Sequence, residues 1–318
     1  MQTMVFRTNK LVYYAKNFLR QLIPGGIYRS RLKSKLEKLD RFDKLVVADR
    51  VNYYNRLDKI QELSPGTPTL LDLKRSKKLK TYRFDAYETA RYFAPSLKAN
   101  FLFGDIIHIP PVPTFVKSRP VNAGSNSVLM KLNKVRHFIF VDDPTPFHHK
   151  KNKLIGRATV TQPHRIRFYE MYFDHPLCDL GQVNVEGGKE GWIKPKISRT
   201  AHLDHKFILC LEGNDVATNL KWVMSSQSIA VMPRPKYETW FMEGKLVGGV
   251  HYIEICDDFT DLEEKLQYYI SHEDEALQII KNANCFVQSF RNEELEELIS
   301  LMVMQKYFNY TGQASYEP

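Results

Sequence analysis

The sequence predicts an α/β fold whose second half alternates between strands and helices. From about Lys153 onward, short apolar runs are separated by segments of helical pattern. The expected strands are Leu154–Val160, Lys206–Leu211, Ser228–Met232 and Val250–Ile255. The expected helices are Pro163–Tyr172, Asp215–Ser225, Leu262–Ser271 and Glu273–Ala283, with a turn or short helix at Tyr237–Glu243. Alternation at this spacing is typical of βαβ units around a parallel, Rossmann-like sheet.

The first half of the chain has a different pattern. Residues 1–63 read as mostly helical and end at the turn Ser64-Pro-Gly-Thr-Pro68. A short helix is expected around Ala86–Phe93, and the proline-punctuated apolar runs Phe101–Ile109 and Arg136–Val141 read as strands and loops. The first half therefore begins with a helical extension and continues into a second strand-containing region.

The length of the chain, 318 residues, is enough for two domains that each bury a core. We expect an N-terminal domain over residues 1–150 and a C-terminal domain over 151–290. The remaining residues, 291–318, contain a helix at Asn292–Phe308 whose first turn is acidic, as the helix dipole favours. We expect this last helix to pack back on the N-terminal domain.

Net positive charge is the main feature of the composition. The formal net charge is +10, and many of the basic residues lie near the start of the chain. Nucleic acid, an anionic membrane surface or a phosphorylated substrate would each explain it. The segment Met4–Ile23 reads either as a membrane-surface helix or as a solvated basic helix packed on its own domain. No recognised nucleic-acid module is present, which argues against that partner.

The sequence also bears on location. No segment reaches the roughly 18 uninterrupted apolar residues that a membrane span needs, and basic residues interrupt every apolar stretch near the N-terminus. The four cysteines stand alone, without CxxC spacing, and we expect free thiols in a reducing compartment. We therefore expect a cytoplasmic protein, peripheral on the inner face of the inner membrane if the basic N-terminus binds lipid.

One strand–turn–helix segment is suited to binding phosphate. The apolar strand Phe207–Leu211 runs into Glu212-Gly-Asn-Asp215, where Gly213 permits a tight turn and Asp215 can cap the following helix. Free amides at a helix start attract anions, and ligands of open α/β sheets gather at the carboxyl ends of strands. Any βα unit offers this geometry, so the turn alone does not identify a ligand.

The segments that follow this turn are more specific. In order, they are Ser225-Ser-Gln-Ser-Ile-Ala-Val-Met-Pro233, Tyr237-Glu-Thr-Trp-Phe241, Val250-His-Tyr-Ile-Glu-Ile255 and Asp258-Phe-Thr-Asp-Leu262. This series resembles glycosyltransferase family 90, which includes protein O-glucosyltransferases, fungal capsule-associated transferases and bacterial lipopolysaccharide core transferases. The resemblance covers roughly Phe147–Phe286 and is densest from Lys206 to Ala283. The bacterial branch matches best, at Glu212–Trp222.

The resemblance implies a two-domain GT-B fold, with an N-terminal acceptor domain and a C-terminal donor domain. It further implies inverting transfer of a sugar, expected to be a hexose, from a UDP-sugar to a lipopolysaccharide core or related surface glycan. It implies no metal requirement, and the sequence has no Asp-x-Asp. The pairs Asp142-Asp143 and Asp257-Asp258 read as turn caps, and His148-His149 reads as a solvated pair on a basic loop.

The resemblance also suggests donor-side residues. Positive charge and amides stabilise a leaving diphosphate, and Arg157 follows Gly156 where the family has an Arg-Gly or Gly-Arg motif. Arg165 and Arg167 are lesser candidates, and Glu238 would hold the ribose hydroxyls. Eukaryotic members carry an arginine where this chain has Asn219, for which Lys221 could compensate. The expected donor-binding residues are Arg157, Gly213, Asn214, Asp215, Asn219, Lys221, Ser226 and Glu238.

On the acceptor side, Asp105 is the expected catalytic base. It follows an apolar strand and precedes a proline-rich loop, as the family's catalytic aspartate does, and Asp142 and Asp143 are the alternatives. The loop Lys117-Ser-Arg-Pro120 and the stretch from Asn126 to His137 resemble acceptor-side features of the bacterial branch. The cations of these segments would hold an anionic core sugar or phosphate; they are Lys117, Arg119, Arg136 and His137.

Two other functions stay open at this point. A protein of the same fold that binds a glycan or nucleotide sugar without turning it over would be consistent with Asn219 at the expected arginine. A nucleic-acid-binding protein would be consistent with the net charge alone.

Overall fold

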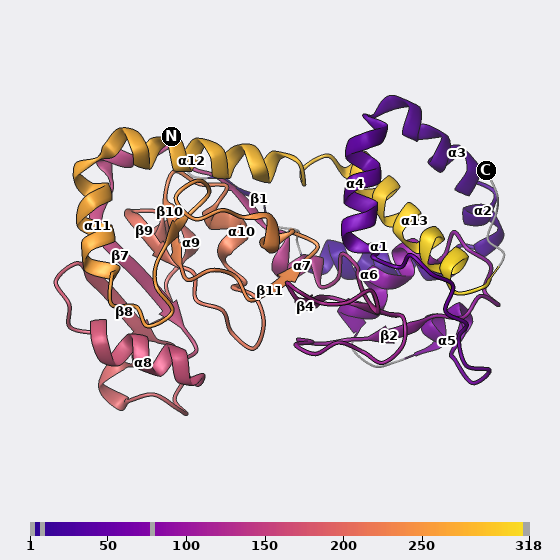
Figure 1. The fold of residues 1–318 in the computed structure, drawn as a ribbon, viewed down its shortest axis with the longest axis horizontal. Helices are drawn as coiled ribbons and strands as arrows, with labels where there is room; N and C mark the ends of the chain where they lie inside the picture. The colour runs from indigo at the N-terminus through magenta and orange to yellow at the C-terminus, as the bar shows by residue number, and fades with distance from the viewer. Residues whose placement is uncertain (1–3, 7–9, 77–79, 314–318) are drawn as a thin grey trace. The chain divides into compact units, whose positions relative to one another are not determined.

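The computed structural model describes residues 4–6, 10–76 and 80–313 and shows an α/β protein (Figure 1). The chain divides into two compact units. The sheet unit contains the described residues of 4–6, 137–236 and 244–289. The helical unit contains the described residues of 10–136, with 237–243 and 290–313. The boundary between the two thus falls after Arg136, not near residue 150, and residues 237–243 belong to the helical unit.

The sheet unit is built on a five-stranded sheet in the order β12-β10-β9-β7-β8, and all of its pairs are parallel. This confirms the parallel sheet that the strand–helix alternation predicts. The strands are β7 (Lys151–Ala158), β8 (Cys178–Gln182), β9 (His205–Leu209), β10 (Ile229–Met232) and β12 (Ile253–Glu254). The helices are α8 (Pro163–Tyr172), α9 (Arg199–His202), α10 (Leu220–Val223), α11 (Leu262–Ser271) and α12 (Glu273–Gln288), with 3₁₀ turns at Phe147–His149 and Glu190–Trp192.

The central strands are apolar because both of their faces are covered. Every residue of β9 and β10 is buried, as expected for a parallel sheet with helices on its faces. Gly156 in β7 allows tight packing, because a Cβ there would lie 3.0 Å from Leu180 and 3.1 Å from Leu209. Helix α8 has proline at its first turn, and its bounds are those predicted from the sequence.

The first described residues form a strand, not a helix. The predicted helix Met4–Ile23 divides into β1 (Met4–Phe6) and α1 (Lys10–Leu22). Strand β1 pairs antiparallel with β6 (Phe140–Asp142). Met-Val-Phe is a short apolar run of strand-favouring residues, and pairing with a distant strand overrides the local helical pattern.

The helical unit combines helices with two small sheets. Strands β2 (Asn100–Leu102), β3 (Thr114–Val116) and β5 (Ser127–Leu129) form a parallel sheet, and β4 (Ser118–Pro120) pairs antiparallel with β11 (Tyr237–Thr239). Its helices are α1, α2 (Gly25–Arg29), α3 (Leu32–Leu36), α4 (Lys44–Tyr54), α5 (Leu70–Arg75), α6 (Lys80–Ala90), α7 (Lys134–His137, crossing the boundary) and α13 (Glu293–Tyr310), with a 3₁₀ turn at Glu37–Arg41. The 3₁₀ turn Glu243–Lys245 also crosses the boundary in the sequence.

Several element bounds in this unit differ from the sequence prediction. The strand expected at Phe101–Ile109 ends at Leu102, and Gly104 takes a φ of 120° that favours glycine. The turn expected at Tyr237–Glu243 begins with strand β11. The helix expected around Ala86–Phe93 is α6, which starts earlier, at Lys80, and ends at Ala90.

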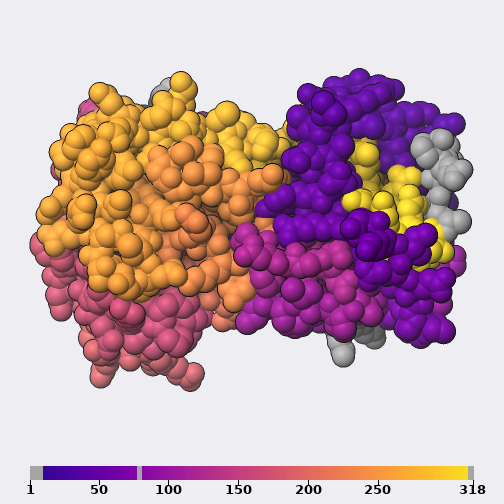
Figure 2. Space-filling model, in the orientation of Figure 1, coloured from indigo at the N-terminus to yellow at the C-terminus, as the bar shows by residue number. Residues whose placement is uncertain are grey.

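Helix α13 packs against α3, α4 and α6, and the space-filling view shows its residues beside those of α3 and α4 (Figure 2). Its buried carboxylate, Glu296, accepts hydrogen bonds from three side chains. Arg50 Nη2 donates to one oxygen at 2.6 Å, while Lys131 Nζ and Trp240 Nε1 donate to the other at 2.7 Å. Trp240 also stacks on Tyr54, with ring centroids 3.8 Å apart. One carboxylate therefore ties α13 to α4, to the segment after β5 and to the segment after β11.

No helix in the described part of the chain combines the length and the apolar character needed to cross a membrane.

Glu296→Gln should lower the free energy of unfolding at pH 7 by about 3–5 kcal/mol, because it leaves two buried cations without their counter-charge. Burial alone would raise the pKa of Glu296, but Lys131 and Arg50 outweigh burial and hold it below the usual 4.5. A depressed carboxyl pKa contributes stability that is fully present above about pH 4.5 and is lost as the pH falls through the folded-state value.

Urea unfolding of the wild type and of Glu296→Gln at pH 7 and pH 3 measures this, with the exposed Glu293→Gln on the same helix as control. The difference in unfolding free energy between the wild type and Glu296→Gln should be smaller at pH 3 than at pH 7. An equal gap at both values would contradict the account.

Candidate active site

The strand order of the five-stranded sheet reverses between β7 and β9. The chain leaves β7, crosses to β8 on one side, and returns to β9 on the other side of β7. The loops after β7 and β9 therefore depart in opposite directions from neighbouring strand ends. In open α/β sheets, this switch point is where a crevice forms and where ligands bind.

Two side chains from the first turn of α8 hold the loop that follows β9. Arg165 donates from Nε to Glu212 O, from Nη2 to Leu211 O and from Nη1 to Thr159 O, each at 2.8 Å. His164 Nε2 lies 2.9 Å from Glu212 O. Because Thr159 follows β7 while Leu211 and Glu212 follow β9, these bonds connect the two loops of the switch point.

The electrostatics of this clamp favour an anion. All three acceptors of Arg165 are neutral carbonyl groups, so they leave its positive charge uncompensated. Burial lowers the pKa of His164 below its usual 6.5, so the imidazole is neutral at pH 7 and donates from Nε2 to the carbonyl. Helix α8 also begins here, and its N-cap, Gln162, makes no side-chain cap bond. A half-buried cation beside a helix N-terminus suits phosphate oxygens.

The predicted phosphate turn is corrected in one respect. Helix α10 begins at Leu220 and has only four residues, so Gly213–Asp215 does not open a helix. Gly213 N donates to Asp215 O, and Asn219 Nδ2 donates to Leu209 O at 2.9 Å. Short polar residues here bond to nearby backbone and stabilise a loop in place of the first helical turns. Asn214 is exposed and accepts a hydrogen bond from Gln162.

Three of the predicted donor residues are buried. Lys221 is 0% exposed, and its ammonium lies 6.0 Å from the centroid of the Phe138 ring. Ser226 is likewise 0% exposed and donates to Val223 O. Asp215 is 3% exposed. Lys221 and Ser226 are thus buried within the sheet unit, and the expected compensation for Asn219 by Lys221 stays a prediction.

Arg157 lies in β7, close to the switch point. Its guanidinium donates to Asp179 Oδ1 at 2.9 Å and to Asp179 O at 2.8 Å, and Lys194 binds the same carboxylate. The side chain crosses Gly181, where a Cβ would lie 2.9 Å from its Cδ. Its contact with a diphosphate stays a prediction.

Glu238 and Arg119, predicted on opposite sides of the reaction, pair with each other. Both are 0% exposed, and Arg119 Nε donates to Glu238 Oε1 at 2.7 Å. Glu238 also accepts from Arg56 at 2.9 Å and from the Tyr53 hydroxyl. Arg119 further donates to three backbone carbonyls, including Ser127 O at 2.8 Å. This network joins β4 to β11, and the ribose role of Glu238 and the acceptor role of Arg119 stay predictions.

Asp105 and Lys117 form a second pair in the helical unit. Asp105 follows β2 and Lys117 follows β3, so both lie at the carboxyl edge of the same parallel sheet. Lys117 Nζ lies 2.5 Å from Asp105 Oδ1, and the side chains are 2% and 32% exposed, respectively. Lys117 is therefore too buried to meet an acceptor directly, while the carboxylate of Asp105 is accessible.

The remaining candidates are Arg136, His137, Asp142 and Asp143. Arg136 is exposed and His137 is 3% exposed, both on α7. Of the alternative bases, Asp143 is buried and accepts hydrogen bonds from Lys150 Nζ at 2.8 Å and Gln227 N at 2.9 Å. Asp142 is exposed at the end of β6.

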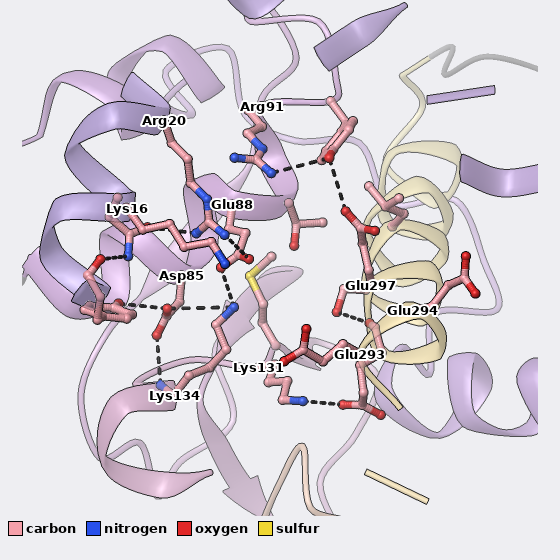
Figure 3. A pocket seen from close by; sticks show the side chains of 18 of the residues that line it. Lys16, Arg20, Asp85, Glu88, Arg91, Lys131, Lys134, Glu293, Glu294 and Glu297 are labelled. Carbon is pink, nitrogen blue, oxygen red and sulfur yellow. Dashed lines mark hydrogen bonds and ion pairs between the residues drawn. The ribbon is translucent and has the colours of Figure 1, made fainter. Parts of the chain in front are cut away.

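The helical unit also contains a cavity of about 620 Å³ (Figure 3). Its walls come from α1, α6, α13 and the segment after β5, and they carry both charges. Arg20 pairs with Glu88 at 2.7 Å, Lys134 with Glu88 at 2.5 Å, and Lys131 with Glu296 at 2.7 Å. The lining as a whole contains as many acidic as basic side chains, so its formal charges give the cavity no preference for one sign of ligand.

Within the described residues, no group of three or more His, Cys, Asp or Glu side chains is arranged to hold a metal ion. Cys178 and Cys210 are buried, Cys256 and Cys285 are exposed, and all four are free thiols.

Two comparisons with known proteins agree on the class. The model of glycosyl transferase family 90 matches residues 177–310. The O-glucosyltransferase LpsA of Dichelobacter nodosus is 39% identical over 305 residues, which are 95% of this chain and 96% of the relative.

Arg165→Ala should weaken UDP binding by about tenfold or more, because it removes both the cation and the bonds that hold the switch-point loops. Isothermal titration with UDP measures the effect. Arg167→Ala is the matched control, since Arg167 is exposed on the same helix. Equal UDP affinities for the two variants would contradict a role of Arg165 in nucleotide binding. Measuring Arg157→Ala in the same series tests the diphosphate contact that the sequence predicts for Arg157.

Proposed function

Because the chain belongs to glycosyltransferase family 90, and is therefore a glycosyltransferase, we propose that it transfers glucose from UDP-glucose to a surface glycan with inversion. The relative's printed name, O-glucosyltransferase, supports glucose as the sugar. The proposal includes a GT-B type of fold and a reaction that needs no metal.

The observation that carries the donor assignment is Arg165 at the switch point. It places a positive charge, bonded only to neutral carbonyls, where the loops after β7 and β9 diverge. Three of its five N–H donors are used there, so two stay available for phosphate oxygens. The cation and the amides at the start of α8 would stabilise the charge that develops on UDP as it leaves.

For the acceptor, we propose Asp105 as the general base. Its carboxylate would take the proton from the attacking hydroxyl while the new bond forms between the hydroxyl oxygen and the anomeric carbon. The bond from that carbon to the β-phosphate oxygen breaks in the same step, and UDP departs with the electron pair. Lys117, held 2.5 Å away, would orient the carboxylate.

The acceptor class we propose is a lipopolysaccharide core or a related lipid-linked glycan. The closeness of the Glu212–Trp222 segment to the bacterial branch of the family supports this choice. Such an acceptor is anchored in a bilayer, so the proposal places the enzyme in the cytoplasm, at the inner face of the inner membrane.

Asp105→Asn should lower kcat by about 10²–10⁴-fold and leave UDP-glucose affinity nearly unchanged, because only proton removal is lost. Release of UDP from UDP-glucose in the presence of a truncated core acceptor gives the rate, and titration gives the affinity. Asp142→Asn is the matched control, and it removes the carboxylate of the alternative base. Loss of activity in Asp142→Asn but not in Asp105→Asn would reverse the assignment.

The same assay distinguishes a glycosyltransferase from a protein of the same fold that binds its ligand without turnover. A protein that only binds would take up UDP-glucose and show no turnover with any core acceptor, in the wild type as in the variants. Competition of other UDP-sugars with UDP-glucose then tests the proposal that glucose is the sugar transferred.

A further inference from the structure

The first long helix, α1, is amphipathic in the reverse of the usual sense. The side chains that face the protein are polar: Tyr13 donates to Asp85 at 2.8 Å, Asn17 is 3% exposed, and Arg20 donates to Glu88 at 2.7 Å. A surface helix of a globular domain usually places its apolar stripe on the core. Here the inward half of the helix makes mainly polar contacts, while Tyr14 and Phe18, at one border of that half, meet the buried ring of Phe84 edge-on.

The charged cavity explains why the polar half faces inward. Helix α1 forms one wall of that cavity with Tyr13, Lys16, Asn17 and Arg20, with Val12 at its rim, and Figure 3 shows Lys16 and Arg20 directed into it. The opposite wall includes Glu293, Glu294 and Glu297 on α13. Polar residues on this half of α1 therefore have ion-pair and hydrogen-bond partners that apolar residues would lack.

The outward half of α1 is apolar along its length. At 100° per residue, the side chains opposite Tyr13 and Asn17 form one continuous stripe. Its large members are Leu11 at 79% exposure, Val12 at 58%, Phe18 at 54%, Leu19 at 62% and Leu22 at 79%, and Ile23 continues it at 38%. Contiguous exposed apolar patches on soluble proteins mark interaction sites, whereas single exposed apolar residues are ordinary.

Basic residues also lie close to this stripe in the sequence. Lys10 begins the helix, and Arg29, Arg31 and Lys33 follow in and after α2; all four are exposed. Over Lys10–Lys33, the sequence contains no aspartate or glutamate. An apolar helix face with cations close to it in the sequence fits a bilayer whose surface is anionic.

We propose that the outward face of α1, which we call the α1 face, docks on the surface of an anionic bilayer. The apolar side chains enter the boundary between headgroups and acyl chains, the helix lies parallel to the surface, and the basic residues contact lipid phosphates. The inference rests on the membrane location proposed above and names the surface responsible for it. It resolves the two sequence interpretations of this segment, because the polar half of the helix packs on its own domain while the apolar half binds lipid.

The experiment is co-sedimentation of the full-length protein with vesicles of phosphatidylcholine alone or with about one-third phosphatidylglycerol. We compare the wild type with Leu19→Gln/Leu22→Gln. The matched control is Ile60→Gln/Val185→Gln, which removes two apolar side chains that are 69% and 84% exposed elsewhere. No UDP-sugar or acceptor is present, so a failure of the transferase proposal leaves this result interpretable.

The wild type and the control should bind the anionic vesicles, with affinity that falls as salt is raised. The α1 double variant should bind them about tenfold or more weakly while keeping its circular dichroism spectrum. Equal binding by the α1 variant, or equal binding to neutral vesicles, would overturn the proposal. So would a wild-type dimer in sedimentation velocity that the α1 substitutions dissociate, because the face would then be covered by a second copy of the chain.

Discussion

Parallel strands that share a sheet must end at one edge, and the strand order here makes the loops after β7 and β9 diverge at that edge. The ends of the two loops are kept together by Arg165, which bonds to Thr159 after β7 and to Leu211 and Glu212 after β9. The arrangement leaves a positive charge surrounded by neutral carbonyls at the place where the fold opens. The donor assignment depends on this one contact more than on any of the residues that the sequence pattern singled out.

The helical unit follows a different rule, in which buried charges are placed in closed networks. Glu296 accepts hydrogen bonds from Arg50, Lys131 and Trp240. Glu238 accepts hydrogen bonds from Arg119, Arg56 and Tyr53. A buried carboxylate is tolerated only when it is paired and hydrogen-bonded. Each network joins segments that are distant in sequence, as β4 and β11 are. Many polar residues of this unit are therefore structural, and Asp105 stands out because its carboxylate stays accessible.

The periodic features of the fold were predictable from the sequence, and the partners of individual polar residues were not. Helix α8 has the predicted bounds because proline at its first turn is a local signal for a helix start. Glu238 and Arg119 were assigned to opposite substrates because residue type gives polarity but not depth, and 119 positions separate them. Arg165 was only a lesser candidate, although its place in the first turn of a helix after a buried strand was the available signal. For α1, the pattern indicated an amphipathic helix but not which half faces the protein, because that depends on the charged walls that α6 and α13 supply.

The central claim is that the nucleotide binds where the β7 and β9 loops diverge. Hydrogen–deuterium exchange of the full-length protein, with and without saturating UDP, tests it most directly, because amides that contact or close around a ligand exchange more slowly. The account predicts protection concentrated in peptides spanning residues 159–166 and 210–215. Protection confined to other segments, with these two unchanged at saturation, would contradict it.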